Sequence, residues 1–300
     1  HSEYFPSQFP EDALPVWAGL GEAAPTISTY GGDVPYPQTT VIPRLQGGES
    51  LRVAGIPQPI PDTPESERRF AEANLRLAET IAARWGVGLT IVPNTQGDPI
   101  GAVARGEADL ALGVRPSWAN ANAVDFTSTY LLRGKRLMTT VRDDFTSLAE
   151  LRGKWIGVFA SEPDAESTVT NLAAGVNASV RVFTITDDGA ARTEMLDERN
   201  IDAVFGDSLR LLPHIEADPE TLKLSDRCAG CDPWYTREYF GAAVPRNDVD
   251  FRLLVEYTLQ ELDMDGTLRE ILVPVTVRGE NVTLSIVPGE ASFMGFVIGN

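Results

Sequence analysis

Side chains that could bind a small polar ligand gather directly after a short apolar run near the middle of the chain. The run, Leu110 to Leu112, is preceded by Asp109 and stopped by Gly113, as is typical of a strand buried on both faces of a parallel sheet. The residues that follow it are Arg115, Ser117, Trp118 and Asn120. Because residues past the carboxyl end of a parallel strand face the ligand crevice of α/β proteins, this segment predicts one wall of a binding site. The alternative is an ordinary surface loop.

Acidic side chains follow two further apolar runs in the second half of the chain. Ser161 and Glu162 follow one predicted strand, and Asp207 follows another. If the two halves of the chain face each other across a cleft, these residues oppose Arg115. Two carboxylates would favour a cationic or amine-bearing group, whereas a guanidinium would bind an anionic or carbonyl oxygen. The alternative is that Glu162 points to solvent and that Arg115 pairs with an acid of the chain itself.

The two cysteines, Cys228 and Cys231, form the sequence CAGC in a polar stretch. Two thiolates without a nearby histidine cannot complete a tetrahedral zinc site, and the only histidines are His1 and His214. A thioredoxin-like redox pair would open a helix after a strand, whereas a proline follows closely here. We therefore expect a local disulfide, which suits an oxidising compartment, and neither a metal nor another cofactor.

The composition indicates a globular protein that is long enough for two cores. The chain has 300 residues, of which 43% are hydrophobic. Its formal net charge of -18 argues against sequence-independent binding to nucleic acid or to anionic membranes, since both need clustered Lys and Arg. No run approaches the roughly 18 apolar residues of a membrane-spanning helix, and no signal-peptide pattern begins the chain. The protein is therefore predicted to be cytoplasmic or to have lost a signal peptide.

Strands and helices alternate through most of the chain, which predicts parallel sheets with helices on their faces. The predicted strands are 51–55, 89–92, 109–112, 155–159, 181–184, 201–205 and 239–244, and the predicted helices are 63–85, 99–105, 148–151, 190–198, 251–264 and one that begins near 164. Gln58 lies in a proline-rich loop after the first strand and is predicted to face the same crevice as Arg115. Segments 91–113 and 182–206 repeat the same order of elements, so two similar lobes are expected.

The two ends of the chain do not follow this pattern. Residues 1–49 contain seven prolines and six glycines without a convincing helical period, so they are predicted to form an extended arm. The arm is rich in aromatic residues, which favours packing along the surface of the main body over simple disorder. At the other end, residues 275–298 alternate valine-rich runs with glycine and predict one or two extra antiparallel strands.

Residues from about 51 to 272 resemble the type II periplasmic solute-binding proteins, specifically the family that serves polar amino acid uptake by ABC transporters. The matching segments, in order, are LRVAG, LAETIAARWGV, GEADLALG with VDFTSTY, SLAELRGKWIGVF, IDAVFGD, YFGAAVPRND and LQELDMDGTLREIL. The resemblance implies two Rossmann-like α/β lobes joined by a hinge, with lobe 1 from 50–138 and 238–300 and lobe 2 from 139–237. It also implies a ligand captured between closing lobes, an ABC permease as partner and a periplasmic location.

The site residues depart from those of the family. The arginine that grips the ligand carboxylate in a Thr-x-x-Arg sequence before VDF is replaced by Asn120, and Arg115 stands where the family has a ligand-contacting threonine. The family's Gly-Thr in lobe 2 is replaced around Ser161 and Glu162, whereas Asp207 matches its acidic residue for the ligand amino group. The aromatic residue that closes over the ligand is absent from IPQPIPDTP. The resemblance therefore implies a changed ligand.

The leading hypothesis is a monomeric, non-enzymatic protein that captures a small polar, amine-bearing or amino-acid-like solute for ABC import. One alternative is an accessory protein with a degenerate cleft that docks another periplasmic protein. A lesser alternative is a dehydratase for cyclohexadienyl acids, which the same fold also hosts, with Glu162, Asp164 or Glu166 as the catalytic acid. The loss of the carboxylate clamp at Asn120 argues against this enzyme.

Overall fold

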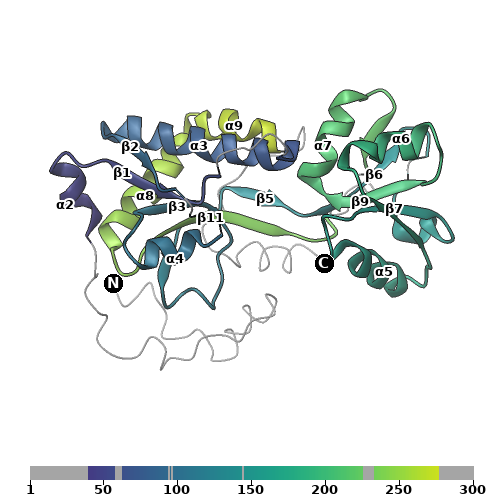
Figure 1. The fold of residues 1–300 in the computed structure, drawn as a ribbon, viewed down its shortest axis with the longest axis horizontal. Coiled ribbons are helices and arrows are strands. Elements are labelled where there is room, and N and C mark those ends of the chain that lie inside the picture. The colour runs from purple at the N-terminus through teal and green to yellow at the C-terminus, as the bar shows by residue number, and fades with distance from the viewer. Residues whose placement is uncertain are drawn as a thin grey trace, which may run out of the picture.

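The structure, a computed structural model, describes residues 40–57, 63–93, 95, 97–143, 145–225 and 233–276. Two α/β lobes, each built on one mixed sheet, lie side by side along the longest axis of the molecule (Figure 1). Lobe 1 contains β1 (Leu51–Ala54), β2 (Leu89–Ile91), β3 (Leu110–Val114), β4 (Val124–Phe126), β5 (Leu131–Arg133) and β11 (Glu238–Pro245), with α2 (Val41–Gln46), α3 (Glu65–Trp85), α4 (Pro99–Ala104), α8 (Val249–Met264), α9 (Thr267–Leu272) and η4 (Val273–Val275). Lobe 2 contains β6 (Lys135–Thr140), β7 (Trp155–Phe159), β8 (Arg181–Ile185), β9 (Ala203–Asp207) and β10 (Leu222–Leu224), with η2 (Leu148–Leu151), α5 (Ala165–Gly175), η3 (Asp188–Ala190), α6 (Ala191–Leu196) and α7 (Ser208–Ala217).

The sheet of lobe 1 has the strand order β2-β1-β3-β11-β4, and β5 pairs with the first residues of β11. Strand β1 is parallel to β2 and β3, whereas β11 is antiparallel to its neighbours β3, β4 and β5. The sheet of lobe 2 has the order β10-β6-β9-β7-β8, in which β7 is parallel to β8 and β9. The carboxyl ends of β1 and β3 in lobe 1, and of β7 and β9 in lobe 2, are the positions outside which α/β sheets generally bind ligands.

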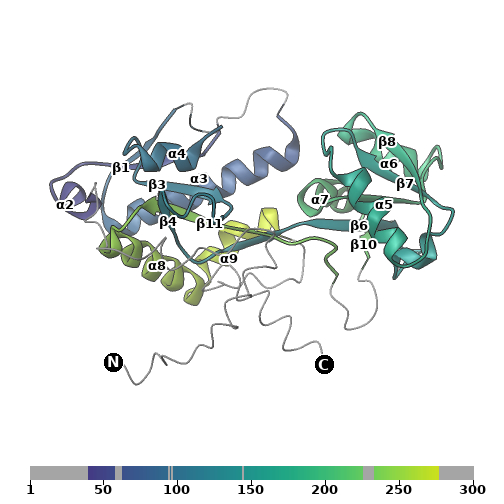
Figure 2. The ribbon, with the colours of Figure 1, turned by 90° about the horizontal axis from the view of Figure 1, so that it is seen from below.

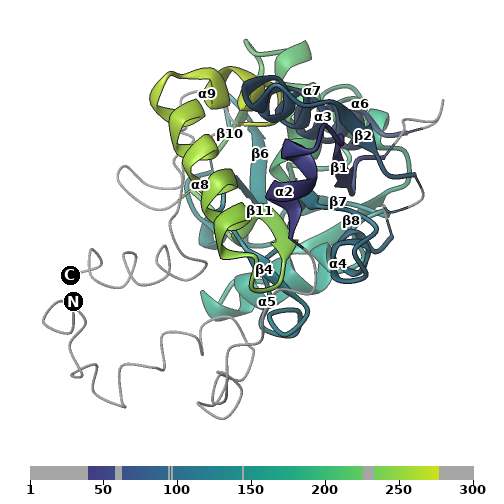
Figure 3. The ribbon, with the colours of Figure 1, turned by 90° about the vertical axis from the view of Figure 1, so that its left-hand side faces the viewer.

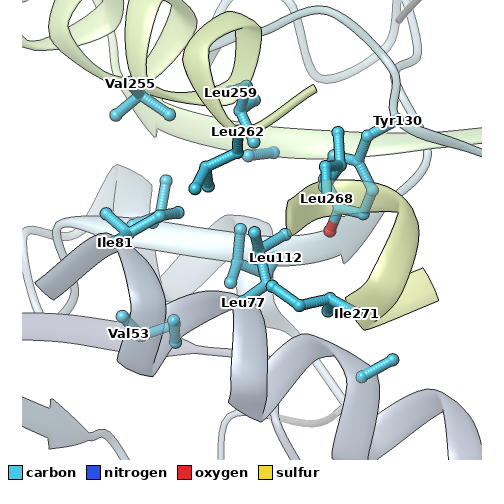
Figure 4. Close-up of a cluster of buried hydrophobic side chains, with 14 of the residues drawn as sticks. Val53, Leu77, Ile81, Leu112, Tyr130, Val255, Leu259, Leu262, Leu268 and Ile271 are labelled. Carbon is cyan, nitrogen blue, oxygen red and sulfur yellow. The ribbon is translucent and has the colours of Figure 1, made fainter. Parts of the chain in front are cut away.

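Alternating apolar side chains explain why helices cover both faces of the first sheet. Leu110 and Leu112 of β3 belong to the cluster that α3, α8 and α9 cover, whereas Ala111 faces α4 on the other side. Figure 4 shows Leu77 and Ile81 of α3 within the first cluster, and both are fully buried. Helix α3 ends at Trp85 because Gly86 adopts the left-handed conformation, with φ of 67°.

Two chain segments cross between the lobes and form the hinge (Figure 2). The first continues from β5 through Gly134 into β6, and the second leads from Thr236 into β11. The Lys135 N–H donates to Thr236 Oγ1 at 2.8 Å, and a Cβ atom at position 134 would lie only 2.0 Å from the Thr236 carbonyl oxygen. Glycine is therefore required at 134 so that the two segments can approach each other.

The predicted fold class of two α/β lobes is confirmed. The prediction of an extended arm over residues 1–49, however, is wrong for its last residues. Val41–Gln46 forms helix α2, whose Val41 and Leu45 are buried in the core of lobe 1. The Val41 N–H donates to Asp248 Oδ2 at 2.8 Å, which holds α2 beside the start of α8 (Figure 3). The helix is too short to show a period in the sequence. Residues 1–39 of the arm, Gln58, the predicted disulfide of Cys228 and Cys231, and the predicted strands beyond 276 lie outside the described residues.

Candidate ligand-binding cleft

The cleft between the lobes is bordered by α3 of lobe 1 and α7 of lobe 2. Ion pairs join these helices across it, with Arg69 Nη1 at 2.7 Å from Glu216 Oε2 and Arg210 Nη2 at 3.5 Å from Glu67 Oε1. Between them lies a cavity of about 260 Å³, lined by Pro64, Glu65, Ser66, Asp188, Gly189, Arg210, Pro213 and His214. Its walls thus come from both lobes, as a ligand cleft that can close requires.

Helix α7 also joins the lobes through apolar packing. Leu211 lies in the core of lobe 2, whereas Leu209 and Leu212 of the same helix lie in the core cluster of lobe 1. All three side chains are buried. The helix therefore holds the lobes together beside the hinge, and the charged groups around the cleft rest on a rigid support.

Glu162 lies three residues after the end of β7 and is buried, with 7% of its side chain exposed. Both of its carboxylate oxygens lie 3.1 Å from the Asp207 N–H, and Arg210 Nε lies 3.3 Å from Oε1. The ammonium of Lys135 donates to Oε2. Burial alone would lower the pKa of Lys135, but the hydrogen bond to Glu162 and nearby carboxylates raise it above its usual range. Glu162 therefore forms an internal ion pair, and the alternative that it points to solvent is wrong.

Asp207 ends β9 and begins α7, and its carboxylate accepts a hydrogen bond from the Leu209 N–H at 2.9 Å. The carboxylate also forms an ion pair with Arg133, whose Nη2 lies 3.1 Å from Oδ1. The guanidinium of Arg133 lies over two rings of lobe 1, 5.0 Å from the centroid of Phe70 and 5.4 Å from that of Phe240. Arg133 thus links an aromatic pair of lobe 1 to an acid of lobe 2.

Arg210 is the second cation that links acids of the cleft. It is 11% exposed and contacts Glu162, Glu67 and Asp188, the last through a short ion pair. One turn later on α7, the imidazole of His214 stacks on Phe159 with ring centroids 6.3 Å apart. Burial lowers the pKa of His214, and the nearby Asp188 opposes this effect. Burial in the cavity wall therefore favours the neutral imidazole.

The loop after β3, which the sequence singles out, is more exposed than the groups of lobe 2. Arg115 has 60% of its side chain exposed and pairs with Glu238 at 3.4 Å. This agrees with the alternative that Arg115 pairs with an acid of the chain itself. Ser117 and Asn120 belong to a turn in which the Asn120 N–H lies 3.3 Å from Ser117 Oγ. Trp118 of this turn is half-buried. Across the cleft, Ser161 is exposed, with Oγ 3.3 Å from Asp188 Oδ1.

The structure therefore brings Glu162 and Asp207 together but supplies each with a cation from the chain. By themselves the two acids predict an amine-bearing solute, but this prediction leaves out their partners Lys135 and Arg133. A signal for both was present in the sequence LLRGKRLMTT, where basic residues interrupt an apolar segment. Among the described residues, no group of three or more His, Cys, Asp or Glu side chains could hold a metal ion.

Two α/β lobes, a two-segment hinge and a cleft at the carboxyl ends of the strands define a type II periplasmic binding protein fold. The sequence profile of the bacterial extracellular solute-binding proteins, family 3, matches residues 72–273, and the chain belongs to this family. No curated protein sequence matches the chain significantly. In the part of the chain that the structure describes, no helix is both long and apolar enough to cross a membrane.

Several solved structures share the fold. An ancestral cationic amino acid solute-binding protein is 20% identical with a TM-score of 0.56, and the match covers 77% of this chain and 96% of that one. The L-cystine solute receptor of Neisseria gonorrhoeae, in an unliganded open conformation, is 16% identical with a TM-score of 0.60, covering 78% and 95%. An ancestral cyclohexadienyl dehydratase is 18% identical with a TM-score of 0.53, also covering 78% and 95%. At these identities the similarity concerns the fold.

Proposed function

We propose that this protein is an extracytoplasmic solute-binding protein that captures a small polar, amino-acid-sized solute and presents it to an ABC importer. The observation that carries the proposal is the interlobe cleft, whose walls come from two lobes joined by a hinge. Contacts from both walls are complete only when the lobes are closed, so a bound solute would shift the population toward closure. Membership of the solute-binding family supports this function and an extracytoplasmic location.

A thermal-shift screen of the full chain tests the proposal. Amino acids, amines, betaines, carboxylic acids and short peptides would be compared at equal concentration. A solute at 100 times its dissociation constant adds about 2.7 kcal/mol to the free energy of unfolding, which gives a clear shift in Tm. Small-angle scattering of the same sample should show a smaller radius of gyration with the solute. If no solute in the panel raises Tm, the transport function is rejected in favour of an accessory role in which the cleft is degenerate.

A dehydratase is a second candidate, because the buried carboxyl of Glu162 follows β7 and contacts Arg210 of the cavity wall, and one similar solved structure is an ancestral dehydratase. A catalytic acid must deliver a proton to its substrate. Burial raises the pKa of Glu162, which favours this role, whereas the Lys135 ammonium stabilises its ionised form, which opposes it. The side chain of Asp164, 65% exposed, is the alternative acid. Turnover of a cyclohexadienyl acid by the wild type, lost in Glu162→Gln or Asp164→Asn, would support the enzyme.

A further inference from the structure

We propose that Arg133 is a specificity-determining residue. It forms an ion pair with Asp207 at the position where a ligand ammonium group would otherwise bind, so that the cleft excludes ammonium-bearing solutes. The preferred solutes would be small carboxylic acids or amides without an amine. The inference rests on the proposed solute-binding function for its ligand class. The mechanism of exclusion, however, concerns only the pairing of Arg133 with Asp207.

The first argument is the position of Asp207. It lies at the carboxyl end of β9, where α/β proteins bind ligands, and begins the helix that borders the interlobe cavity. A carboxylate without a partner there would attract a cationic group of a solute. The guanidinium of Arg133 lies 3.1 Å from it, and the two side chains are only 18% and 15% exposed. The pair is therefore sheltered from solvent, and its attraction is screened less than that of a surface pair.

The second argument is that two packed aromatic rings hold the guanidinium of Arg133 in place. Phe70 of α3 and Phe240 of β11 pack edge to face, with centroids 5.5 Å apart, and both rings contact the guanidinium. Cation–π contacts of this kind stabilise the position of the charge. A solute ammonium that displaced Arg133 would leave a mostly buried guanidinium without its carboxylate, which is strongly unfavourable.

The third argument is that neighbouring acids are also paired. Glu162 contacts Lys135 and Arg210, and Asp188 contacts Arg210. A cationic solute would therefore have to break an existing ion pair at each of these positions. The exposed guanidinium of Arg115, by contrast, is available to a carboxylate or carbonyl oxygen at the cost of one contact at 3.4 Å.

The test compares the wild type with Arg133→Gln by titration calorimetry, with L-lysine and L-arginine as ammonium-bearing probes and succinate as an amine-free probe. Arg133→Gln frees the Asp207 carboxylate. The affinity of this variant for lysine should rise at least about tenfold, because a ligand ammonium group gains a charge-assisted contact with Asp207. Arg133→Lys keeps a cation beside Asp207 and should not show the gain. Arg192→Gln removes a pair with Asp218 elsewhere in lobe 2 and serves as the matched control.

Adding Asp207→Asn to Arg133→Gln should abolish the gained affinity, which a purely structural role of Arg133 would not produce. The inference is overturned if Arg133→Gln binds lysine no better than the wild type does. It is also overturned if the wild type binds lysine and Asp207→Asn abolishes that binding. This second test does not require that an Arg133 variant folds. If the wild type binds none of the probes and none of the panel solutes, the proposed function is rejected. The inference about Arg133 still stands or falls by itself, because the gain in lysine affinity is measured in Arg133→Gln.

Discussion

Asp109 in lobe 1 and Glu162 in lobe 2 are both buried carboxylates held by two cations, but they lie at opposite ends of their sheets. Asp109 precedes β3 and is fully buried, with Arg44 Nη2 at 2.5 Å and Arg52 Nη2 at 2.7 Å. Glu162 follows β7 and contacts Lys135 and Arg210. The first group lies at the amino end of the strands and the second at the carboxyl end, where ligands bind in α/β sheets.

The comparison shows how similar chemistry serves different purposes at the two ends. The partners of Asp109 belong to α2 and β1, so the cluster ties elements of one lobe together. The partners of Glu162 belong to β6, directly after the hinge, and to α7, which contacts both lobes. A change at Asp109 should therefore affect stability alone, whereas a change at Glu162 should affect both stability and solute binding.

The largest expected effect is that of Asp109→Asn. Loss of the buried charge removes the acid that Arg52 contacts and leaves Arg44 with Glu49, and breaking a buried pair costs about 3 to 5 kcal/mol. Urea unfolding at pH 7 should show this loss, while the solute affinity of the remaining folded protein stays unchanged. Glu107→Gln is the matched control, because its carboxylate is 50% exposed and pairs only with the exposed Arg105 among the described contacts. Its loss should leave the free energy of unfolding nearly unchanged, because the pair is exposed to solvent. A fall in affinity with Asp109→Asn would erase the proposed contrast.

Glu162→Gln is expected to come next. The amide can still accept from the Asp207 N–H, but it no longer neutralises Lys135 and Arg210, so we expect a loss of about 2 to 4 kcal/mol. The raised pKa of Lys135 means that its contribution is fully present below its unfolded value of 10.5 and is lost as the pH rises through the folded pKa. Urea unfolding of the wild type should therefore show this loss in the alkaline range, and the variant should not. Solute affinity should also fall, and an unchanged affinity would place Glu162 with Asp109 as a purely structural acid.

The sequence predicts where these acids lie but not what they contact. Asp109, Glu162 and Asp207 border apolar runs, so their places at strand ends follow from the pattern. Lys135 lies opposite Asp207 in the antiparallel pairing of β6 with β9, which brings it beside the acids of lobe 2. The two residues are 72 positions apart in the sequence, so no local pattern reveals this contact. The apolar pattern also does not predict strand β6, because charged residues are rarely buried, yet Lys135 and Arg136 are 6% and 1% exposed. The fold was therefore predictable, whereas the charge pairing in the cleft was not.

A smaller effect is expected from Arg69→Ala, which removes the ion pair to Glu216 across the cleft. The pair is partly exposed, so the free energy of unfolding should change by less than about 1 kcal/mol. Because the contact joins the two lobes, solute affinity should fall by up to about fivefold. Arg68→Ala is the matched control, since Arg68 pairs with Glu65 and Glu72 within α3. Equal affinities for the two variants would show that the interlobe pair does not contribute to closure.

The smallest effect concerns the pH dependence of His214 in the cleft wall. Because burial lowers its folded pKa below 6.5, the unfolded chain binds the proton more readily. Its contribution to stability is therefore complete above pH 6.5 and is lost as the pH falls through the folded pKa. Between pH 7.5 and pH 5.5, the free energy of unfolding by urea should fall more steeply for the wild type than for His214→Gln. His1, the other histidine, is common to both proteins, so its titration cancels in the difference. Parallel curves would show that the imidazole is as well solvated in the cleft as in the unfolded chain, in which case the α7 face of the cavity is open to water.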